Sequence, residues 1–138
     1  DVLRSCMAKA QIILMGLDEA EQLYQTADVQ DIFKLVFESG KAECAVIKNG
    51  AEGAVVSDGK DTFEIPPYPC HPVDPVGAGD AFNAAFLCGI LEHQPLRICG
   101  RMGGVAGGLG TETFGDFEGY PDQAQMARIL AGRAEIYR

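Results

Sequence analysis

The sequence has no long hydrophobic run and no surplus of positive charge. No apolar stretch of its 138 residues approaches the roughly 20 that a membrane-spanning helix needs, and no basic segment precedes an apolar one as in a signal peptide. The formal net charge is −9, and lysine and arginine are scattered rather than clustered. These absences predict a cytoplasmic protein that binds neither a membrane nor nucleic acid.

Clustered cysteines are also missing. The five cysteines are an odd number without C-x-x-C spacing, which argues against a disulfide framework or a zinc site. Cys44, Cys88 and Cys99 lie within apolar stretches and are expected to be buried as small hydrophobic side chains. Cys70 and His71 are adjacent, but no second cluster completes a metal or thiolate site around them.

The apolar residues, 47% of the chain, are sufficient for a buried core. Their periodicity alternates between that of strands and that of helices, which indicates an α/β protein. Strands are expected at 12–15, 44–47, 54–56 and 62–65, and helices at 2–9, 18–24, 28–37, 79–93, 95–109 and 126–136. No repeat or low-complexity linker divides the chain, which is therefore expected to form one unit.

Several local signals mark where these elements begin and end. Asp18 with Glu21 three residues later is a capping-box arrangement, and Asp28 is expected to cap the next helix. Pro95 is expected at the first position of its helix, and Asp58-Gly59 is a hairpin signal.

Four glycines lie inside the 95–109 helix: Gly103, Gly104, Gly107 and Gly108. Each costs about 1 kcal/mol relative to alanine, so they indicate tight packing or a nearby ligand.

The segment 74–82 places a glycine turn directly before an apolar, alanine-rich helix. Glycine lets backbone N–H groups approach a ligand closely because no Cβ intervenes, and the first N–H groups of the helix are unpaired and favour an anion. Asp80 lies at the junction, where its carboxylate could accept a proton from a hydroxyl nucleophile. Phosphate-binding amides beside a base suit phosphoryl transfer; the alternative is a purely structural turn.

This segment, Asp74-Pro75-Val76-Gly77-Ala78-Gly79-Asp80-Ala81-Phe82, closely resembles the C-terminal signature of the ribokinase-like (PfkB-type) carbohydrate kinases, D-T-x-G-A-G-D-[AS]-F, with Pro75 in place of threonine. The resemblance runs along nearly the whole chain. It implies a three-layer α/β/α fold with a mainly parallel sheet, of which residues 1–138 would be the C-terminal, nucleotide-binding portion without the N-terminal half and lid. It also implies that the amides of Gly77, Ala78 and Gly79 stabilise the transferring phosphoryl group and that Asp80 activates the sugar hydroxyl.

Two earlier segments resemble the same family. Glu19 lies where the family has the glutamate of N-x-x-E, which holds Mg²⁺ through water, whereas Gly16 replaces the asparagine. The alternative is that Glu19 simply complements the helix dipole, as acidic residues in a first helical turn commonly do.

A strand followed by G-x-x-G borders the nucleotide in the family, and the alternative is an ordinary turn. The implied nucleotide-binding residues here are Lys48, Gly50, Ala51, Glu52 and Gly53.

Two later segments complete the resemblance. Gly104 and Gly107 fall on a helix that borders adenine in the family, with Gly104 at a position that often bears asparagine. A loop comparable to 110–116 contributes backbone oxygens to a monovalent-cation site in several relatives, and Asp74 would contribute to that site. Pro75 removes one side-chain oxygen from it.

The resemblance predicts phosphoryl transfer from ATP, assisted by Mg²⁺, to a hydroxyl of a sugar or sugar acid. The residues of these motifs look most like those of 2-keto-3-deoxygluconate kinases. The alternatives are a non-catalytic nucleotide-binding or regulatory module of the same fold, and a dehydrogenase, for which G-x-G-x-x-G after the first strand is missing. The sequence begins with Asp1 rather than Met, which indicates a fragment or a trimmed product. Because the resemblance implies that the N-terminal half and lid, which would fix the acceptor, are absent, we expect this piece to be inactive by itself. Its open strand edge near 12–15 would favour self-association into a homo-oligomer.

Overall fold

The computed structural model describes residues 2–38 and 40–136. The chain divides into two compact units, the first ending at Ile65 and the second beginning at Pro66, a division that the sequence patterns did not predict. The division falls where Pro66, Pro67, Pro69 and Pro72 keep the backbone extended and lack the N–H groups of a strand or helix. Each unit is therefore described by itself.

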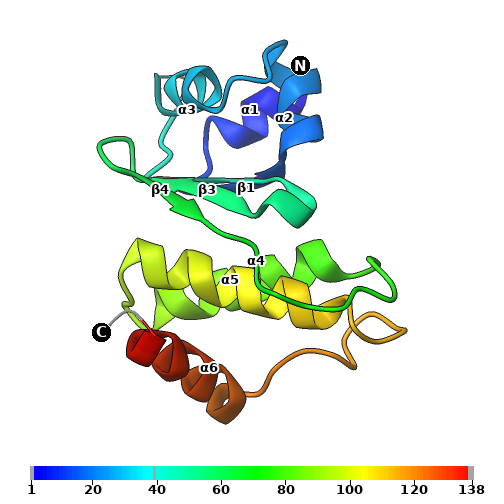
Figure 1. Cartoon of the computed structure of the whole chain (residues 1–138). Coiled ribbons are helices and arrows are strands. Elements are labelled where there is room, and N and C mark those ends of the chain that lie inside the picture. Colours follow the sequence, from blue (N-terminus) through cyan, green and yellow to red (C-terminus); the bar gives the residue numbers. More distant parts are fainter. Residues whose placement is uncertain (1, 39, 137–138) are drawn as a thin grey trace. The chain divides into compact units, whose positions relative to one another are not determined.

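The first unit combines helices with a four-stranded sheet (Figure 1). Its elements are α1 (Val2–Met7), β1 (Ile12–Gly16), α2 (Leu17–Tyr24), α3 (Val29–Glu38), β2 (Cys44–Lys48), the 3₁₀ helix η1 (Gly50–Glu52), β3 (Ala54–Ser57) and β4 (Thr62–Ile65). The strands lie in the order β1-β2-β3-β4. The expected α/β class is thus confirmed.

Pairing within this sheet is mixed. β1 and β2 are parallel, and β2–β3 and β3–β4 are antiparallel, so these four strands are not mainly parallel. The physical reason is the length of the connections. Residues 49–53 and 58–61 are too few for the crossover that parallel neighbours require, whereas two helices lie between β1 and β2.

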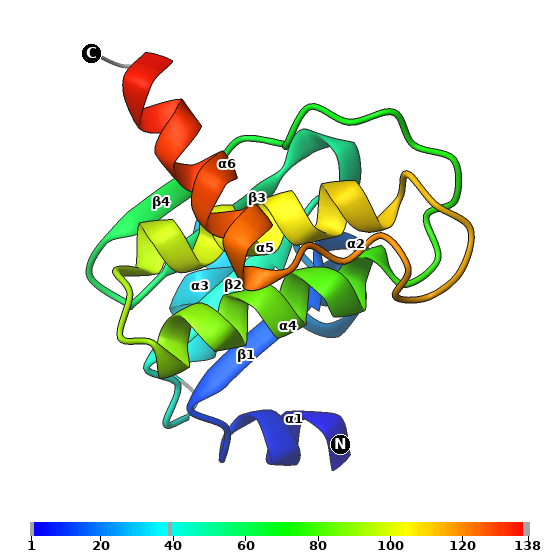
Figure 2. The same ribbon diagram turned by 90° about the horizontal axis from the view of Figure 1, so that it is seen from below.

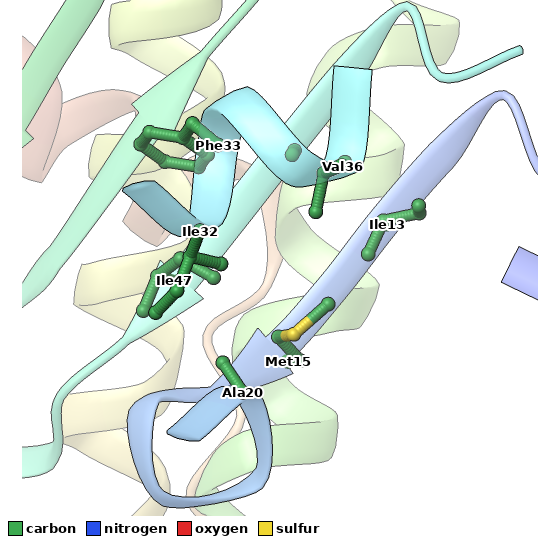
Figure 3. Close-up of a cluster of buried hydrophobic side chains, with 8 residues drawn as sticks. Ile13, Met15, Ala20, Ile32, Phe33, Val36 and Ile47 are labelled. Carbon is green, nitrogen blue, oxygen red and sulfur yellow. The ribbon is translucent and has the colours of Figure 1, made fainter. Parts of the chain in front are cut away.

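The core of the first unit lies between this sheet and α3 (Figure 3). Ile32 and Val36 are four residues apart in α3 and therefore on the same helix face. They point toward Ile13 of β1 and Ile47 of β2. Because each such side chain contributes about 1.5–3 kcal/mol when fully buried, this contact stabilises the β1–β2 pair that carries the candidate site residues described below.

Helix starts in the first unit confirm one capping prediction and correct another. Asp28 caps α3, because its Oδ1 accepts a hydrogen bond from the Asp31 N–H at 2.9 Å. Asp18 is not the cap of α2: the helix begins at Leu17, and the Gly16 N–H donates to Oε2 of Glu19 at 2.7 Å. The reason is that β1 runs directly into α2, so Gly16 takes the N-cap position and Glu19 the position three residues on.

The β3–β4 hairpin confirms the Asp58-Gly59 signal. Oδ1 of Asp58 accepts hydrogen bonds from the N–H groups of Lys60 and Asp61 at 2.9 and 2.7 Å, and these bonds to the charged form lower the pKa of Asp58. The buried Ser57 hydroxyl donates to the Asp61 carbonyl at 3.0 Å and accepts from the Gly59 N–H. The turn is therefore held by its own side chains.

The second unit consists of α4 (Ala78–Leu91), α5 (Leu96–Gly110) and α6 (Gln123–Ile136) with their connecting loops. α4 and α5 lie side by side in both views (Figures 1 and 2). Pro95 is the N-cap of α5 rather than its first residue. Among the described residues, no helix has the length and apolar character to span a membrane.

Glycines allow α4 and α5 to approach closely, which confirms tight packing as one reason for them. A Cβ on Gly103 would lie 2.8 Å from the ring of Phe82. A Cβ on Gly89 would lie 2.9 Å from Sγ of Cys99 and 3.1 Å from its Cα. All three distances are shorter than an ordinary van der Waals contact, so the two helices require glycine at these positions.

Burial of the cysteines is confirmed at two of three positions. Cys44 and Cys99 are buried, and burial raises the pKa of the Cys99 thiol. Cys88 is exposed, so that prediction is wrong. An apolar run in a helix points in all directions, and the buried residues of α4 are Ala81, Phe82, Phe86 and Gly89.

We expect Gly89→Ala to destabilise the protein by about 1–3 kcal/mol, the usual cost of overpacking, although alanine favours a helix by about 1 kcal/mol. The added methyl group meets Cys99, whose thiol is held by a hydrogen bond to the Gln94 carbonyl. Urea unfolding followed by circular dichroism measures the change. Gly132→Ala in α6 is the matched control, because nothing lies within 4 Å of its Cβ position. It should be neutral or stabilising, and equal effects of the two variants would contradict the packing argument.

Candidate active site

The glycine turn, residues 74–77, ends in a left-handed residue directly before the first residue of α4. Gly77 has φ 78° and is the N-cap of the helix, a conformation that glycine adopts without the steric cost other residues pay. Its carbonyl accepts the first helical hydrogen bond from the Ala81 N–H at 2.9 Å. Asp80 is exposed in the first turn of α4. The local sequence thus places a carboxylate at the positive end of a helix, as predicted.

The amide groups of this turn differ in whether they have a partner. The Ala78 N–H donates to the Pro75 carbonyl at 3.2 Å. Within residues 40–136, the N–H groups of Gly77, Gly79 and Asp80 donate no hydrogen bond, as expected for the start of a helix. Two of the three predicted phosphate-binding amides are therefore unpaired, and the Asp80 amide joins them.

The loop 111–120 holds the glycine turn through backbone contacts. The Thr111 carbonyl accepts hydrogen bonds from the N–H groups of Val73 and Asp74 at 2.7 and 2.9 Å. The Asp116 carbonyl lies 2.7 Å from the position that a Cβ on Gly77 would take. The Tyr120 hydroxyl donates to the Gly77 carbonyl at 3.2 Å. The resemblance placed the loop that contains Thr111 beside Asp74, but sequence reasoning missed Tyr120, because no motif marks a residue that acts through such a long-range contact.

Asp74, the predicted ligand of a monovalent cation, has a role inside the turn. Its Oδ1 accepts a hydrogen bond from the Val76 N–H at 3.0 Å, which is the pattern of an Asx turn. The Thr111 carbonyl already accepts two hydrogen bonds. The structure therefore accounts for Asp74 as a turn residue, and cation binding there stays a prediction.

Two negatively charged side chains, Asp80 and Asp116, act on the hydroxyl of Tyr120. Burial of the Tyr120 phenol raises its pKa above the ordinary value near 10, and the negative charges of Asp80 and Asp116 raise it further. These two carboxylates therefore lie close enough to the hydroxyl to act on it through their charge. The hydroxyl stays protonated, and remains a hydrogen-bond donor, throughout the neutral pH range.

Gly107, one of the predicted nucleotide-binding residues, lies against the start of α4. A Cβ on Gly107 would be 3.2 Å from the Ala78 carbonyl and 3.5 Å from Cβ of Phe82. Gly104 is half-buried in the same helix. The structure gives Gly107 a packing role next to the glycine turn, and nucleotide contacts by Gly104 and Gly107 stay predictions.

In the first unit, the remaining predicted residues lie at one edge of the sheet. Gly16 and Lys48 are register partners at the ends of the parallel strands β1 and β2. α2, with Glu19, begins directly after β1, and the loop 50–53 follows β2. The carboxyl ends of parallel strands are where α/β proteins bind ligands. The structure thus brings Lys48, Glu19 and the loop to the same edge.

Turn geometry in the loop 50–53 requires its glycines. Gly50 has φ 49° and Gly53 has φ 96°, both in the range that glycine favours. The Asn49 N–H donates to the Gly53 carbonyl at 2.8 Å, and the Gly53 N–H donates to the Gly50 carbonyl at 3.2 Å. Both glycines therefore have a structural role as a turn, and their contact with a nucleotide stays a prediction.

Glu19 fits a Mg²⁺ held through water. One of its oxygens, Oε2, is occupied by the Gly16 N–H, and the side chain is exposed. In the part of the chain that the structure describes, no three His, Cys, Asp or Glu side chains are grouped to hold a metal ion. Mg²⁺ commonly binds through one or two carboxylates, several waters and the phosphates of its substrate, so a single carboxylate is compatible with this role.

Comparison with known proteins agrees with the motif at 74–82. The model of the pfkB family carbohydrate kinases matches residues 1–123. The chain belongs to the pfkB family of carbohydrate kinases. This pfkB-family chain spans less than half the length of the curated relatives described next.

Three of these relatives carry different names. An uncharacterized sugar kinase of Archaeoglobus fulgidus is 32% identical over 86% of this chain and 47% of the relative. A cytidine kinase of Thermococcus kodakarensis is 36% identical over 75% of this chain and 37% of the relative. A 2-dehydro-3-deoxygluconokinase of Haemophilus influenzae is 29% identical over 79% of this chain and 35% of the relative. All three names denote kinases, but they do not name a common acceptor.

Solved structures confirm the ribokinase-like α/β fold. An E. coli protein described as a ribokinase II, in complex with ATP and Mg²⁺, superposes with a TM-score of 0.87 at 21% identity. The alignment covers 96% of this chain and 42% of that protein. A ribokinase of Thermotoga maritima gives a TM-score of 0.82 at 18% identity, over 93% of this chain and 44% of that protein.

We expect Gly77→Ala to destabilise the glycine turn by about 1–3 kcal/mol or more, because a Cβ would both strain the left-handed backbone and meet the Asp116 carbonyl. Urea unfolding and the hydrogen exchange of the first turn of α4 measure this. Gly50→Ala is the matched control: its φ is also positive, but nothing lies within 4 Å of its Cβ position. It should show the backbone cost alone. A Gly77 variant as stable as the Gly50 variant would contradict the Asp116 contact.

Proposed function

We propose that this chain carries the phosphoryl-transfer residues of a kinase that moves the γ-phosphoryl group of ATP to a hydroxyl of a sugar or sugar acid. The observation that carries the proposal is the exposed Asp80 carboxylate, which stands in the same helical turn as unpaired amides. A general base and an anion-binding group are the two functions that phosphoryl transfer to a hydroxyl requires.

In the proposed reaction, Asp80 accepts the proton of the acceptor hydroxyl as its oxygen bonds to the γ-phosphorus. The bond between the γ-phosphorus and the bridging oxygen breaks, and ADP leaves with that oxygen. The N–H groups of Gly79 and Asp80 stabilise the negative charge on the transferring group, together with the positive end of α4. The left-handed Gly77 directs the backbone so that these groups remain unpaired.

The first unit supplies the other proposed contacts. Lys48 and the loop 50–53 would contact the nucleotide, and Glu19 would hold Mg²⁺ through water. Bound Mg²⁺ would neutralise phosphate charge. Support for these roles comes from their common place at the carboxyl ends of β1 and β2 and from the family resemblance, in which the same motif positions have these roles.

The acceptor is the least constrained part of the proposal. We infer that the acceptor is 2-keto-3-deoxygluconate from the residues of the motifs. The 2-dehydro-3-deoxygluconokinase of Haemophilus influenzae supports that choice at 29% identity. The cytidine kinase, at 36% identity, makes a nucleoside the second candidate. Asp80 would serve either acceptor, since both offer a hydroxyl proton.

A non-catalytic nucleotide-binding module is the remaining alternative. The exposed and chemically intact Asp80 favours catalysis, because a module that only binds a nucleotide has no need of a base there. Dependence on a monovalent cation, self-association and a cytoplasmic location also remain predictions.

Asp80→Asn should lower kcat by about 10²–10⁴, the usual contribution of a general base, with little change in the affinity for ATP. ADP release by the full product of the gene that encodes this chain measures kcat, with 2-keto-3-deoxygluconate and cytidine offered separately. Asp61→Asn, an exposed aspartate in the β3–β4 turn, is the control and should retain normal turnover. Near-normal turnover of the Asp80 variant would remove the central assignment.

Glu19→Gln should raise the Mg²⁺ concentration needed for half-maximal activity by about tenfold, the lower end of the effect of losing a supporting ligand. The amide oxygen of glutamine can still accept the Gly16 N–H, so the helix cap is retained. Glu21→Gln in the same helix is the matched control and should leave the Mg²⁺ requirement unchanged. An unchanged requirement in the Glu19 variant would leave Glu19 with its capping role alone.

A further inference from the structure

The Gly77 carbonyl accepts two hydrogen bonds, one from its own helix and one from a distant part of the second unit. One is the helical bond from the Ala81 N–H at 2.9 Å. The other comes from the Tyr120 hydroxyl at 3.2 Å, a residue 43 positions away in the sequence. The helical bond forms whether or not a tyrosine is present, so the hydroxyl adds a separate constraint. It acts on the orientation of the peptide unit between Gly77 and Ala78.

The Tyr120 ring is itself held in place, which gives its hydroxyl a defined position. The ring packs against the cluster formed by Ala81, Met102, Val105, Ala106 and Met126. A Cβ on Gly110, the last residue of α5, would lie 3.6 Å from Cε1 of Tyr120. Gly119, the residue before Tyr120, also lies against the end of α5, because a Cβ on Gly119 would be 2.6 Å from the Leu109 carbonyl. The end of α5 therefore determines where the hydroxyl lies.

The same hydroxyl lies within the electrostatic influence of Asp80. Burial is the larger cause of the raised pKa of Tyr120, and the Asp80 and Asp116 charges are the next causes. Because its pKa is raised, the hydroxyl stays protonated and can hold the Gly77 carbonyl as a donor throughout the neutral pH range. Hydrogen-bond geometry and charge thus connect Tyr120 to the residues proposed for phosphoryl transfer.

We propose that Tyr120 is a positioning residue for phosphoryl transfer: its hydroxyl fixes the Gly77 carbonyl and thereby sets the direction of the Gly79 and Asp80 amides and of the Asp80 carboxylate. This inference rests on the proposed function. Tyr120 does not itself touch the reacting atoms. Its effect is on how often the first turn of α4 adopts the geometry that transfer requires, and geometry of this kind has a large effect on rate.

A structural role alone would make a different prediction. The tyrosine ring, with its packing in the cluster, is retained in Tyr120→Phe, and only the hydroxyl is lost. If the hydroxyl served stability alone, the folded protein would have normal kinetics. If it positions Asp80 and the amides, the folded variant has a lower kcat with an unchanged KM for ATP, because transition-state contacts are lost and ground-state contacts are kept.

The first experiment is steady-state kinetics of Tyr120→Phe in the full product of the gene. We expect kcat to fall about fivefold to tenfold, the scale of one neutral hydrogen bond, with KM for ATP changed less than twofold. Tyr24→Phe on α2 is the matched control, which loses a hydroxyl in the first unit and should keep its kcat. An unchanged kcat in a folded Tyr120 variant, or a loss of turnover explained entirely by a higher KM, overturns the inference.

The second experiment does not depend on activity. The ¹H–¹⁵N signals of Gly79 and Asp80 report the direction and environment of the two amides. We expect both signals to shift in Tyr120→Phe and to stay in place in Tyr24→Phe. Unshifted signals overturn the inference whether or not the protein is a kinase. Shifted signals in a protein without sugar- or nucleoside-dependent ADP release would support the positioning contact and refute the proposed function.

Discussion

The left-handed backbone of Gly77 is the constraint on which the candidate active site depends. This conformation ends the turn and starts α4, so it determines where the unpaired amides and the Asp80 carboxylate stand. It can exist only because the residue has no Cβ, since the Asp116 carbonyl lies 2.7 Å from where a Cβ would be. The loop that includes Asp116 also contains Thr111 and Tyr120, whose hydrogen bonds hold both ends of the turn. Phosphate binding and base catalysis are thus proposed for residues whose geometry another segment determines.

In the first unit the corresponding constraint is the parallel pairing of β1 and β2. Because the strands are in register from Ile12 with Cys44 to Gly16 with Lys48, both end at the same edge, and the segments after them begin there. The contact between α3 and these strands buries Ile13, Ile32 and Ile47 and stabilises the pair (Figure 3). Mixed pairing in the rest of the sheet follows from short connections and does not alter this edge.

Family membership and acceptor identity depend on different residues, which explains why one is established and the other is proposed. The roles proposed for residues 77–80 concern a phosphoryl group and a hydroxyl proton, which all acceptors of such kinases share. Relatives that match this chain are accordingly named for a sugar acid and for cytidine. Discrimination between acceptors requires contacts with the hydroxyls and rings that differ between them, and no such contact enters the assignment of Asp80.

The sequence by itself determined features that depend on neighbouring residues. The order of strands and helices, the Asp28 cap, the Asp58 turn and the glycine turn before α4 all follow from contacts within a few positions. The tertiary structure decided the rest. Gly16 and Glu19, rather than Asp18 and Glu21, form the capping box of α2 because β1 runs directly into that helix. Cys88 is exposed because only one side of α4 is buried. Tyr120 could not be found beforehand, since its partner Gly77 lies 43 residues away in the sequence and is brought near only when α5 packs against α4.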